Sequence, residues 1–330
     1  MRLAAVALVM MLATGPAAGA GPCEPVTLVD EATGRSVVGA EDIALDQDSG
    51  RLVVSAHDRL AGADPGGGLY GLDLGHLATG GVRVRDLADG TVRRPHGIDL
   101  YEGKTLFVVD RGDGEIGSTA VWIIDLAGGG RRRVENPLLC RANDIAALDS
   151  TRFLFTADHG ACGRIGVAVE NILGLARGFV GYFDGETVRA VASGLDFPNG
   201  IAVNRRRDEV VVAATRGREL LVYGQAELLA GAPARRRLPL DGAPDNLSVT
   251  DDGRILVALH PALWRLALHR YGLPGGEHAP SRIESLDMAG GARRVFEDDG
   301  TRLSAATVAV AWRDRLLIGS VLGDHLWLCR

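Results

Sequence analysis

The chain has 330 residues, of which 46% are hydrophobic and 24% charged, with a formal net charge of −6 at pH 7. This length fits either two domains or one large closed all-β domain. The basic residues are scattered, and their short runs at 131–133, 205–207 and 235–237 stand next to strand-like segments. Such runs are typical of solvated turns and edges, so we exclude nucleic acid as a partner.

The N-terminal segment reads as a targeting sequence. Arg2 precedes a short apolar run at 3–14, and the small-residue pattern Ala18-Gly19-Ala20 follows it. This pattern predicts a secretory signal over residues 1–20, with the mature chain starting at Gly21. No stretch reaches the ~20 apolar residues of a transmembrane helix. We therefore expect a secreted or periplasmic protein with a single domain over residues 21–330.

Because a secretory signal is predicted, we expect the four cysteines to lie in an oxidising compartment. Cys23 lies just inside the predicted mature start and Cys329 is the penultimate residue, so a bond between them would tie the two ends of the chain. Cys140 and Cys162 remain as a second pair or as two free thiols. Four cysteines allow three pairings, and no CxxC motif supports a zinc site.

The mature chain reads as strands nearly throughout. The expected strands are short, β-branched or aromatic, and bounded by Asp, Gly or Arg turns. They are 51–55, 105–109, 120–124, 152–155, 209–212, 220–223, 254–258 and 315–319. Only residues 168–178 and 224–231 have helical character.

A phrase recurs along these strands: an acid, amide or Pro-His-Gly element, then apolar residues, a polar turn and a second apolar run. The phrases start near residues 42, 96, 143, 199, 246 and 307. A period of about 50 residues fits one four-stranded blade each, which predicts an all-β, six-bladed β-propeller. The sixth phrase, at 306–310, lacks the acid or amide pair.

The residues that open the phrases are expected to converge on the central channel, where the innermost strands begin. They are Glu41, Asp42, His96, Asn143, Asp144, Asn199, Asp245 and Asn246. Four acids at one centre repel one another without a counterion. The amides among them and the absence of cysteine favour calcium over zinc, because calcium accepts six to eight oxygen ligands, neutral carbonyls included.

These motifs resemble the serum paraoxonase/arylesterase family over essentially the whole mature chain. The resemblance rests on Pro95-His96-Gly97-Ile98, Asn143-Asp144-Ile145, the segment 194–201, the segment 245–249, His260-Pro261 and the segment 317–321. The two terminal cysteines fit the same pattern. More distantly, the chain is similar to gluconolactonase-like propellers.

The resemblance implies a six-bladed propeller that holds two calcium ions in its channel and is closed by a Cys23–Cys329 disulfide. The residues that match the catalytic ion's ligands are Glu41, Asn143, Asn199, Asp245 and Asn246. Those that match the structural ion's ligands are Asp42, Asp144 and the backbone carbonyl of Ile98. The family hydrolyses lactones and aryl esters.

Besides calcium, hydrolysis needs a base that takes a proton from the attacking water. His96, next to the ion cluster, is the leading candidate, and Asp245 is the alternative. Arg111 stands where the family's proposed dyad has a second histidine, so His96 would act alone or with a carboxylate such as Asp110. Further family positions are expected to line the pocket: Asp158, His159, Phe197, His260 and Val321.

Two classes of function follow from this pattern. The first is a secreted calcium-dependent hydrolase of small-molecule lactones or aryl esters, with a sugar lactonase as a variant. The second is a non-catalytic propeller that uses calcium for stability and binds a partner on its top face. The phrases contain more ligand-type residues than one structural ion needs, which favours the enzyme.

Overall fold

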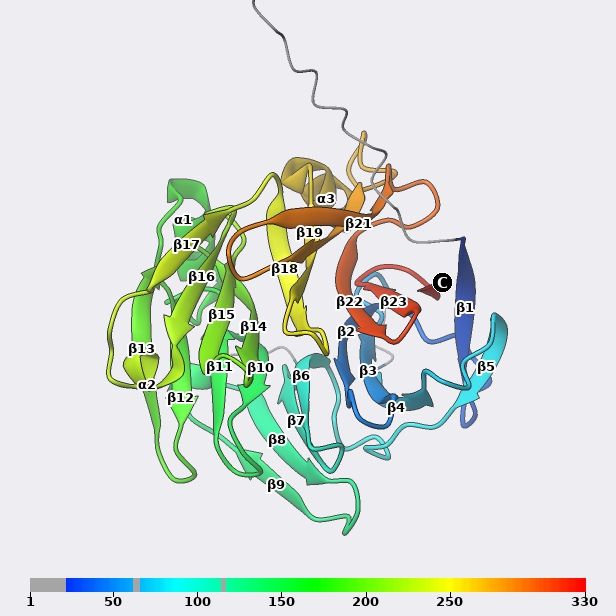
Figure 1. Ribbon diagram of the computed structural model, residues 1–330, viewed down its shortest axis with the longest axis horizontal. Helices are drawn as coiled ribbons and strands as arrows, with labels where there is room; N and C mark the ends of the chain where they lie inside the picture. The colour runs from blue at the N-terminus through cyan, green and yellow to red at the C-terminus, as the bar shows by residue number, and fades with distance from the viewer. Residues whose placement is uncertain (1–21, 62–65, 114–116) are drawn as a thin grey trace, which may run out of the picture.

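Six β-sheets surround a common centre in the computed structural model, which describes residues 22–61, 66–113 and 117–330 (Figure 1). The predicted signal segment lies outside the described residues. The innermost strands of the six sheets are β2 (Ala40–Leu45), β6 (Pro95–Tyr101), β10 (Ala142–Ala147), β14 (Pro198–Asn204), β18 (Ala243–Val249) and β22 (Ala306–Trp312). Each contacts the next, and β22 contacts β2, so the ring is closed. The predicted six-bladed propeller is confirmed.

Four blades have the expected four antiparallel strands in chain order. Their outer strands are β7 (Thr105–Asp110), β8 (Ala120–Asp125), β9 (Arg131–Val134), β11 (Phe153–Ala157), β12 (Gly178–Phe183), β13 (Val188–Leu195), β15 (Glu209–Ala214), β16 (Glu219–Gly224), β17 (Arg236–Pro239), β19 (Ile255–His260), β20 (Ser281–Leu286) and β21 (Ala292–Asp298).

The first and last blades depart from this plan. The first has three strands, β2, β3 (Arg51–His57) and β4 (Gly67–Asp73). The last has five, because β1 (Cys23–Asp30) follows β22, β23 (Arg315–Ser320) and β24 (Leu326–Cys329), and β5 (Gly80–Val84) then joins β1 in parallel. The expectation of four strands in every blade is wrong here, because the segment that would complete the first blade pairs with the strand that closes the ring.

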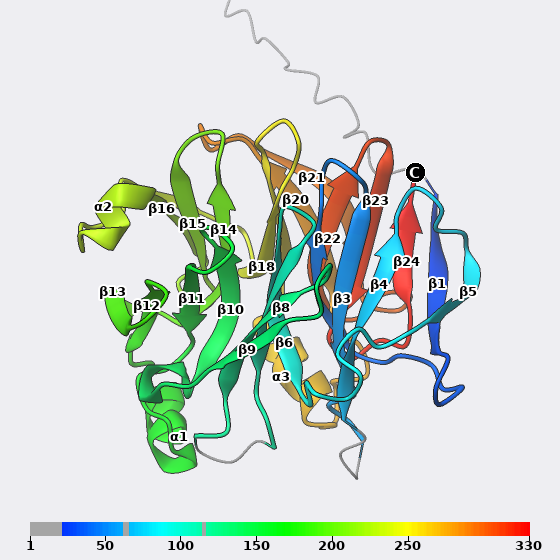
Figure 2. The same ribbon diagram turned by 90° about the horizontal axis from the view of Figure 1, so that it is seen from below.

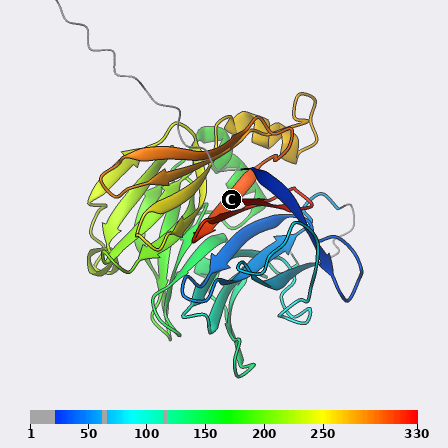
Figure 3. The same ribbon diagram turned by 45° about the vertical axis from the view of Figure 1, so that its right-hand side comes forward.

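Ring closure places the two ends of the described chain side by side (Figure 3). Strand β1 pairs antiparallel with β24, and Cys23 stands opposite Cys329 in the register. The disulfide Cys23–Cys329 joins them, and a second one joins Cys140 to Cys162, so both predicted pairs form. The cysteines within the described residues are thus all oxidised.

Every innermost strand carries a β-bulge at its beginning. The register shifts fall at 40–42, 95–98, 142–145, 198–201, 244–247 and 306–308. A bulge inserts an extra residue and turns side chains out of strict alternation. The bulged positions are those of the repeated acid/amide phrases, so the fold displays these side chains at the centre rather than in the sheet.

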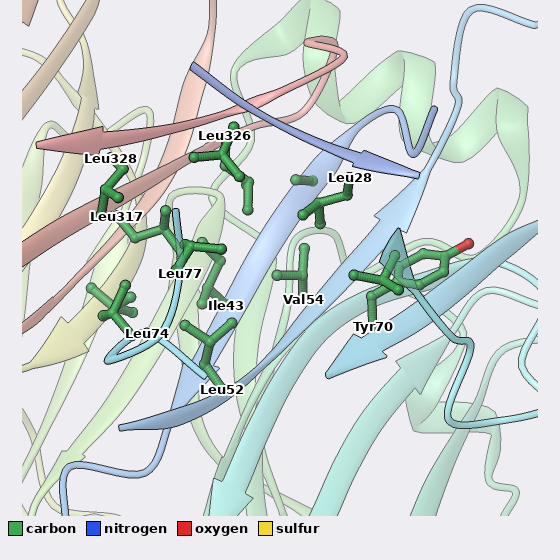
Figure 4. Close-up of a cluster of buried hydrophobic side chains, with 14 of the residues drawn as sticks. Leu28, Ile43, Leu52, Val54, Tyr70, Leu74, Leu77, Leu317, Leu326 and Leu328 are labelled. Carbon is green, nitrogen blue, oxygen red and sulfur yellow. The ribbon is translucent and has the colours of Figure 1, made fainter. Parts of the chain in front are cut away.

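The cores lie between neighbouring blades. In one of them Leu28 of β1, Val54 of β3 and Leu328 of β24 pack together, so the ring closure is buried as well as covalent (Figure 4). Between the third and second blades, Phe153 packs against Phe107 and Phe183 with ring centroids 5.8 and 5.0 Å apart.

Helices are few and short. Helix α1 (Arg164–Leu173) begins earlier than the expected 168–178, α2 (Gln225–Leu229) falls within the expected 224–231, and α3 (Leu263–Arg270) was not expected. Helices α1 and α3 lie on the same face of the propeller and α2 on the opposite one (Figure 2). In the part of the chain that the structure describes, no helix has the length and apolarity to cross a membrane.

Candidate functional site

The face that carries α1 and α3 opens into a central cavity of about 370 Å³. Its floor is formed by residues that open the innermost strands. They are Glu41, His96, Asn143, Asn199, Asp245 and, from the sixth blade, Thr307. The predicted convergence of the phrases on the axis is therefore confirmed, and Thr307 supplies the sixth position that lacked an acid or amide.

Three asparagines near the beginnings of innermost strands share one arrangement. The amide nitrogens of Asn143, Asn199 and Asn246 donate to the carboxylates of Asp158, Asp245 and Glu41, respectively. Their amide oxygens are buried and accept no hydrogen bond from the described residues. The three side chains are only 4, 8 and 1% exposed. A buried carbonyl oxygen without a donor is costly, and a hard cation would satisfy all three.

A second cavity, of about 290 Å³, lies beneath this floor and is lined by Asp42, Asp144 and Ile98. Glu41 and Asn143, the neighbours of the two aspartates, line the upper cavity instead. Consecutive residues thus face two compartments, as strand geometry allows. This separation matches the two depths expected for two ions.

Asp42 and Asp144 also join neighbouring blades. Asp42 accepts hydrogen bonds from the backbone N–H groups of Ile43 and Ile98, and Asp144 from those of Ile145 and Ile201. Burial and the charge of Glu41 hold the pKa of Asp42 above its usual range, and burial and Asp42 do so for Asp144. Without a cation, these carboxylates therefore favour the protonated form.

His96 and Glu41 form one acid–imidazole pair. The Nδ1 atom of His96 lies 2.7 Å from the Oε2 atom of Glu41. Burial alone would raise the pKa of Glu41, but His96, Arg59 and Arg111 lower it to about 2. Burial and the charge of Arg111 lower the pKa of His96 to about 4. At neutral pH this histidine is uncharged and donates its Nδ1 proton to Glu41.

Asp245 and His260 form a second pair. The Nε2 atom of His260 lies 2.7 Å from Oδ2 of Asp245, whose Oδ1 accepts the amide of Asn199 at 2.5 Å. Burial raises the pKa of Asp245, whereas His260 opposes that effect. Both oxygens of Asp245 are therefore engaged, which leaves it less free than His96 to take a proton from water.

Asp158 anchors a third group. It lies 2.7 Å from Nδ1 of His159, 2.9 Å from Arg141 and 3.3 Å from Arg111. Burial would raise its pKa, but His159 and the two arginines hold it far below the usual range. The Nε2 atom of His159 lies 2.9 Å from Oδ1 of Asn171, so both ring nitrogens are engaged.

Asp110 does not form the partnership with His96 that the sequence left open. Its carboxylate accepts the backbone N–H groups of Arg93, Arg94 and Gly112 and the indole N–H of Trp122. It is buried away from the upper cavity, so Glu41 takes the place beside His96.

The remaining predicted pocket residues, Phe197, His260 and Val321, all line the upper cavity. Phe197 has a positive φ of 57° and packs edge-on against His159, with ring centroids 5.2 Å apart. A positive φ in a bulky residue is a strained conformation that often marks a functional site.

Several lining residues were missed in the sequence. They are Arg59, Arg141, Thr215, Arg216, Arg270 and Thr307. A signal for Thr215 existed in the sequence. Like Arg111, Asp158 and Val321, it directly follows the second strand of a blade. This position is equivalent from blade to blade, so the second strands build a wall above the floor.

The donor set suits calcium better than a transition metal. Within 22–61, 66–113 and 117–330, no three His, Cys, Asp or Glu side chains lie in a metal-binding arrangement. An ion on the floor would therefore depend on the asparagine oxygens as well as on carboxylates. Neutral amide oxygens are ordinary ligands for calcium.

Comparisons with known proteins identify relatives in one family. The chain is 32% identical over 200 residues to serum paraoxonase/arylesterase 1 of Rattus norvegicus and 28% identical over 197 residues to that of Homo sapiens. These alignments cover 60% and 59% of the chain and 55% of each relative, so the chain spans about half the length of the curated relatives it matches.

Solved structures resemble the whole described fold. A gluconolactonase from Xanthomonas campestris has a TM-score of 0.57 and 19% identity, with 96% of this chain and 98% of that chain covered. Regucalcin from Agrobacterium tumefaciens, a calcium-binding protein, has a TM-score of 0.52 and 13% identity, with 92% and 95% covered. These similarities support the propeller fold alone. The arylesterase family model matches residues 130–329, more than half of the chain, and the protein therefore belongs to the arylesterase family.

Proposed function

We infer that this protein is a calcium-dependent hydrolase of lactones and aryl esters that acts outside the cytoplasm. The observation that carries this proposal is the set of three buried asparagine oxygens without a donor among the described residues, at Asn143, Asn199 and Asn246. Asn143 and Asn199 line the upper cavity together with His96. Family membership supports the ester or lactone chemistry. Two disulfides fit an oxidising compartment.

The catalytic ion would be held by Glu41, Asn143, Asn199, Asp245 and Asn246, as the family resemblance implies. Asp42, Asp144 and the carbonyl of Ile98 would hold a structural ion below. Bound at the floor of the upper cavity, calcium would supply Lewis-acid chemistry for an ester carbonyl.

His96 is the base that the geometry favours. Its Nδ1 proton is directed to Glu41, which fixes the ring and leaves Nε2 as the acceptor for a proton from water. Asp245 holds His260 and Asn199 through its two oxygens, so its contribution is to position the asparagine oxygen and bind the ion.

The test is hydrolysis of a lactone panel and phenyl acetate at fixed calcium, with and without a chelator. Asn199→Ala should abolish turnover and weaken calcium binding. Asn204→Ala is the comparison variant, because Asn204 is also buried and lies at the other end of the same strand, where it lines the lower cavity and not the upper one. If the wild-type protein hydrolyses none of the substrates faster than the Asn199→Ala variant does, the enzyme hypothesis is rejected in favour of a non-catalytic binding propeller.

A further inference from the structure

The upper cavity is rich in arginine. Five arginines line it, against three carboxylates: Arg59, Arg111, Arg141, Arg216 and Arg270 against Glu41, Asp158 and Asp245. The chain as a whole carries a net charge of −6. Hydrolysis of an uncharged ester does not require this concentration of positive charge. The five arginines differ in whether a carboxylate is paired with them.

Three of the five arginines are held by carboxylates. Arg111 and Arg141 both pair with Asp158, at 3.3 and 2.9 Å. Arg216 pairs with Asp196 at 2.9 Å and lies over the ring of Phe197. Each of these three arginines thus has a carboxylate partner in the wall of the cavity, although Arg111 and Arg141 share one, so they build the pocket rather than await a ligand.

Arg59 is different. Its Nη1 donates to the carbonyl oxygen of His57 at 3.1 Å, and its Nη2 lies 3.4 Å from Nδ1 of His96. Because that nitrogen carries the proton donated to Glu41, it cannot accept from Arg59. Among the described residues Arg59 forms no ion pair within 4 Å, although it is half-buried beside the floor. A guanidinium so placed has donors left for a ligand.

Arg270 lines the same cavity from the last turn of α3, and it is exposed. A cation at the end of a helix is favoured by the helix dipole, which accounts for Arg270 without a ligand but not for Arg59. The two charges interact: burial lowers the pKa of Arg59, Glu41 raises it and Arg270 lowers it further. Two like charges therefore face one cavity, without a carboxylate paired to either among the described residues.

We propose that Arg59 and Arg270 bind a carboxylate carried by the substrate, so that the preferred substrates are lactones or esters with an acid group away from the reacting carbonyl. This inference rests on the proposed hydrolase function. Guanidinium groups bind carboxylates through paired, charge-assisted hydrogen bonds. Leu266 of α3, Tyr271 directly after α3 and Val321 line the same cavity, and they offer an apolar wall for the carbon skeleton of the substrate.

The carboxylate takes no part in bond making. The water oxygen bonds to the carbonyl carbon, the ring C–O bond breaks, and the proton lost by water ends on the leaving alkoxide. The acid group orients the ring so that its carbonyl reaches the asparagine oxygens and the ion they would hold, which converts binding energy into alignment.

The test uses a matched pair of substrates, 5-oxotetrahydrofuran-2-carboxylate and its primary amide, which differ only in the charge. The wild-type protein with calcium should favour the acid by roughly 10- to 100-fold in kcat/KM, the size of a charge-assisted hydrogen bond. Most of this preference should appear in KM. Tetrahydrofuran-2-carboxylate, which has no bond to cleave, should inhibit competitively.

The variants Arg59→Gln and Arg270→Gln should each bring the acid-to-amide ratio toward one and weaken inhibition by tetrahydrofuran-2-carboxylate. Arg265→Gln is the matched control, because Arg265 lies on the same helix but does not line the cavity; it should keep the ratio. If one variant fails to fold, the other variant and the wild-type ratio still decide the matter.

Two failures are distinguishable. A wild-type protein that hydrolyses neither substrate contradicts the proposed hydrolase function. A protein that hydrolyses the amide as fast as the acid, or faster, remains a lactonase but overturns the carboxylate proposal.

Discussion

Gly97 is the residue at which a single added methyl group would press directly on the backbone of the candidate site. A Cβ atom at Gly97 would lie 2.4 Å from the Cα atom of Asp144 and 2.6 Å from the carbonyl oxygen of Asn143. Ordinary contacts begin at 3.4 Å, so Gly97→Ala must move β6 and β10 apart by about 1.0 Å, the difference between 3.4 and 2.4 Å. The obstacle is backbone, which cannot turn aside as a flexible side chain can.

Overpacking of this kind costs roughly 1–3 kcal/mol, and a large domain loses roughly 2–4 °C of Tm for each kcal/mol. We therefore expect Gly97→Ala to lower Tm by roughly 3–10 °C. Calcium affinity and kcat/KM should fall as well, because Asn143 and Asp144 are the residues displaced.

The assay is thermal unfolding and calcium titration of Gly97→Ala beside Gly81→Ala. Gly81 lies on β5, and a Cβ there meets nothing within 4 Å, so its alanine variant should behave like the wild type. Equal melting temperatures and equal calcium affinities for the two variants would refute the close approach of β6 and β10 as the basis of the site.

Three further outcomes are expected. The Cys23→Ser/Cys329→Ser variant should lose on the order of 4–5 kcal/mol, seen in denaturant unfolding, because the disulfide closes a loop of about 300 residues. In chelated protein, the raised pKa values of Asp42 and Asp144 mean that folding binds protons. The stability contributed by these groups is therefore present at low pH and lost as pH rises, so Tm should increase as the pH is lowered, and the calcium-loaded protein should show the opposite trend as protons compete with the ion. His96→Gln should lower kcat by roughly 100-fold or more in the arylesterase assay while leaving calcium affinity largely intact, and an unchanged kcat would exclude His96 as the base.

The sequence was sufficient for the architecture and for the floor of the cavity. Six phrases at a regular period require six equivalent units, and the propeller is the closed all-β fold that brings their first residues together. The pairing of Cys23 with Cys329 was one of three that the sequence allowed, and the family resemblance implied it; the disulfide confirms it.

The residues that form the walls of the site could not be predicted from the six repeated sequence phrases. Arg59 and Arg270 stand in segments without a repeated pattern, and their importance depends on which carboxylates lie near them in space. The bulge that directs Asn143 and Asp144 into different cavities could not be predicted either, because hydrophobic periodicity describes a strand without a bulge. Helix α3 was missed because it is only eight residues long and none of its residues is buried, so its apolar residues do not mark a stripe that faces a core.

The hydrogen bond from Asn246 to the carbonyl oxygen of Glu41 spans 205 residues of sequence. Contacts of such high order form late in folding, since the chain must first lose the entropy of closing so long a loop. During synthesis from the N-terminus, the first blade must wait for the fifth before this contact can exist. Occupancy of the central site should therefore report that the ring is complete, and a truncated or misassembled chain should give no such signal.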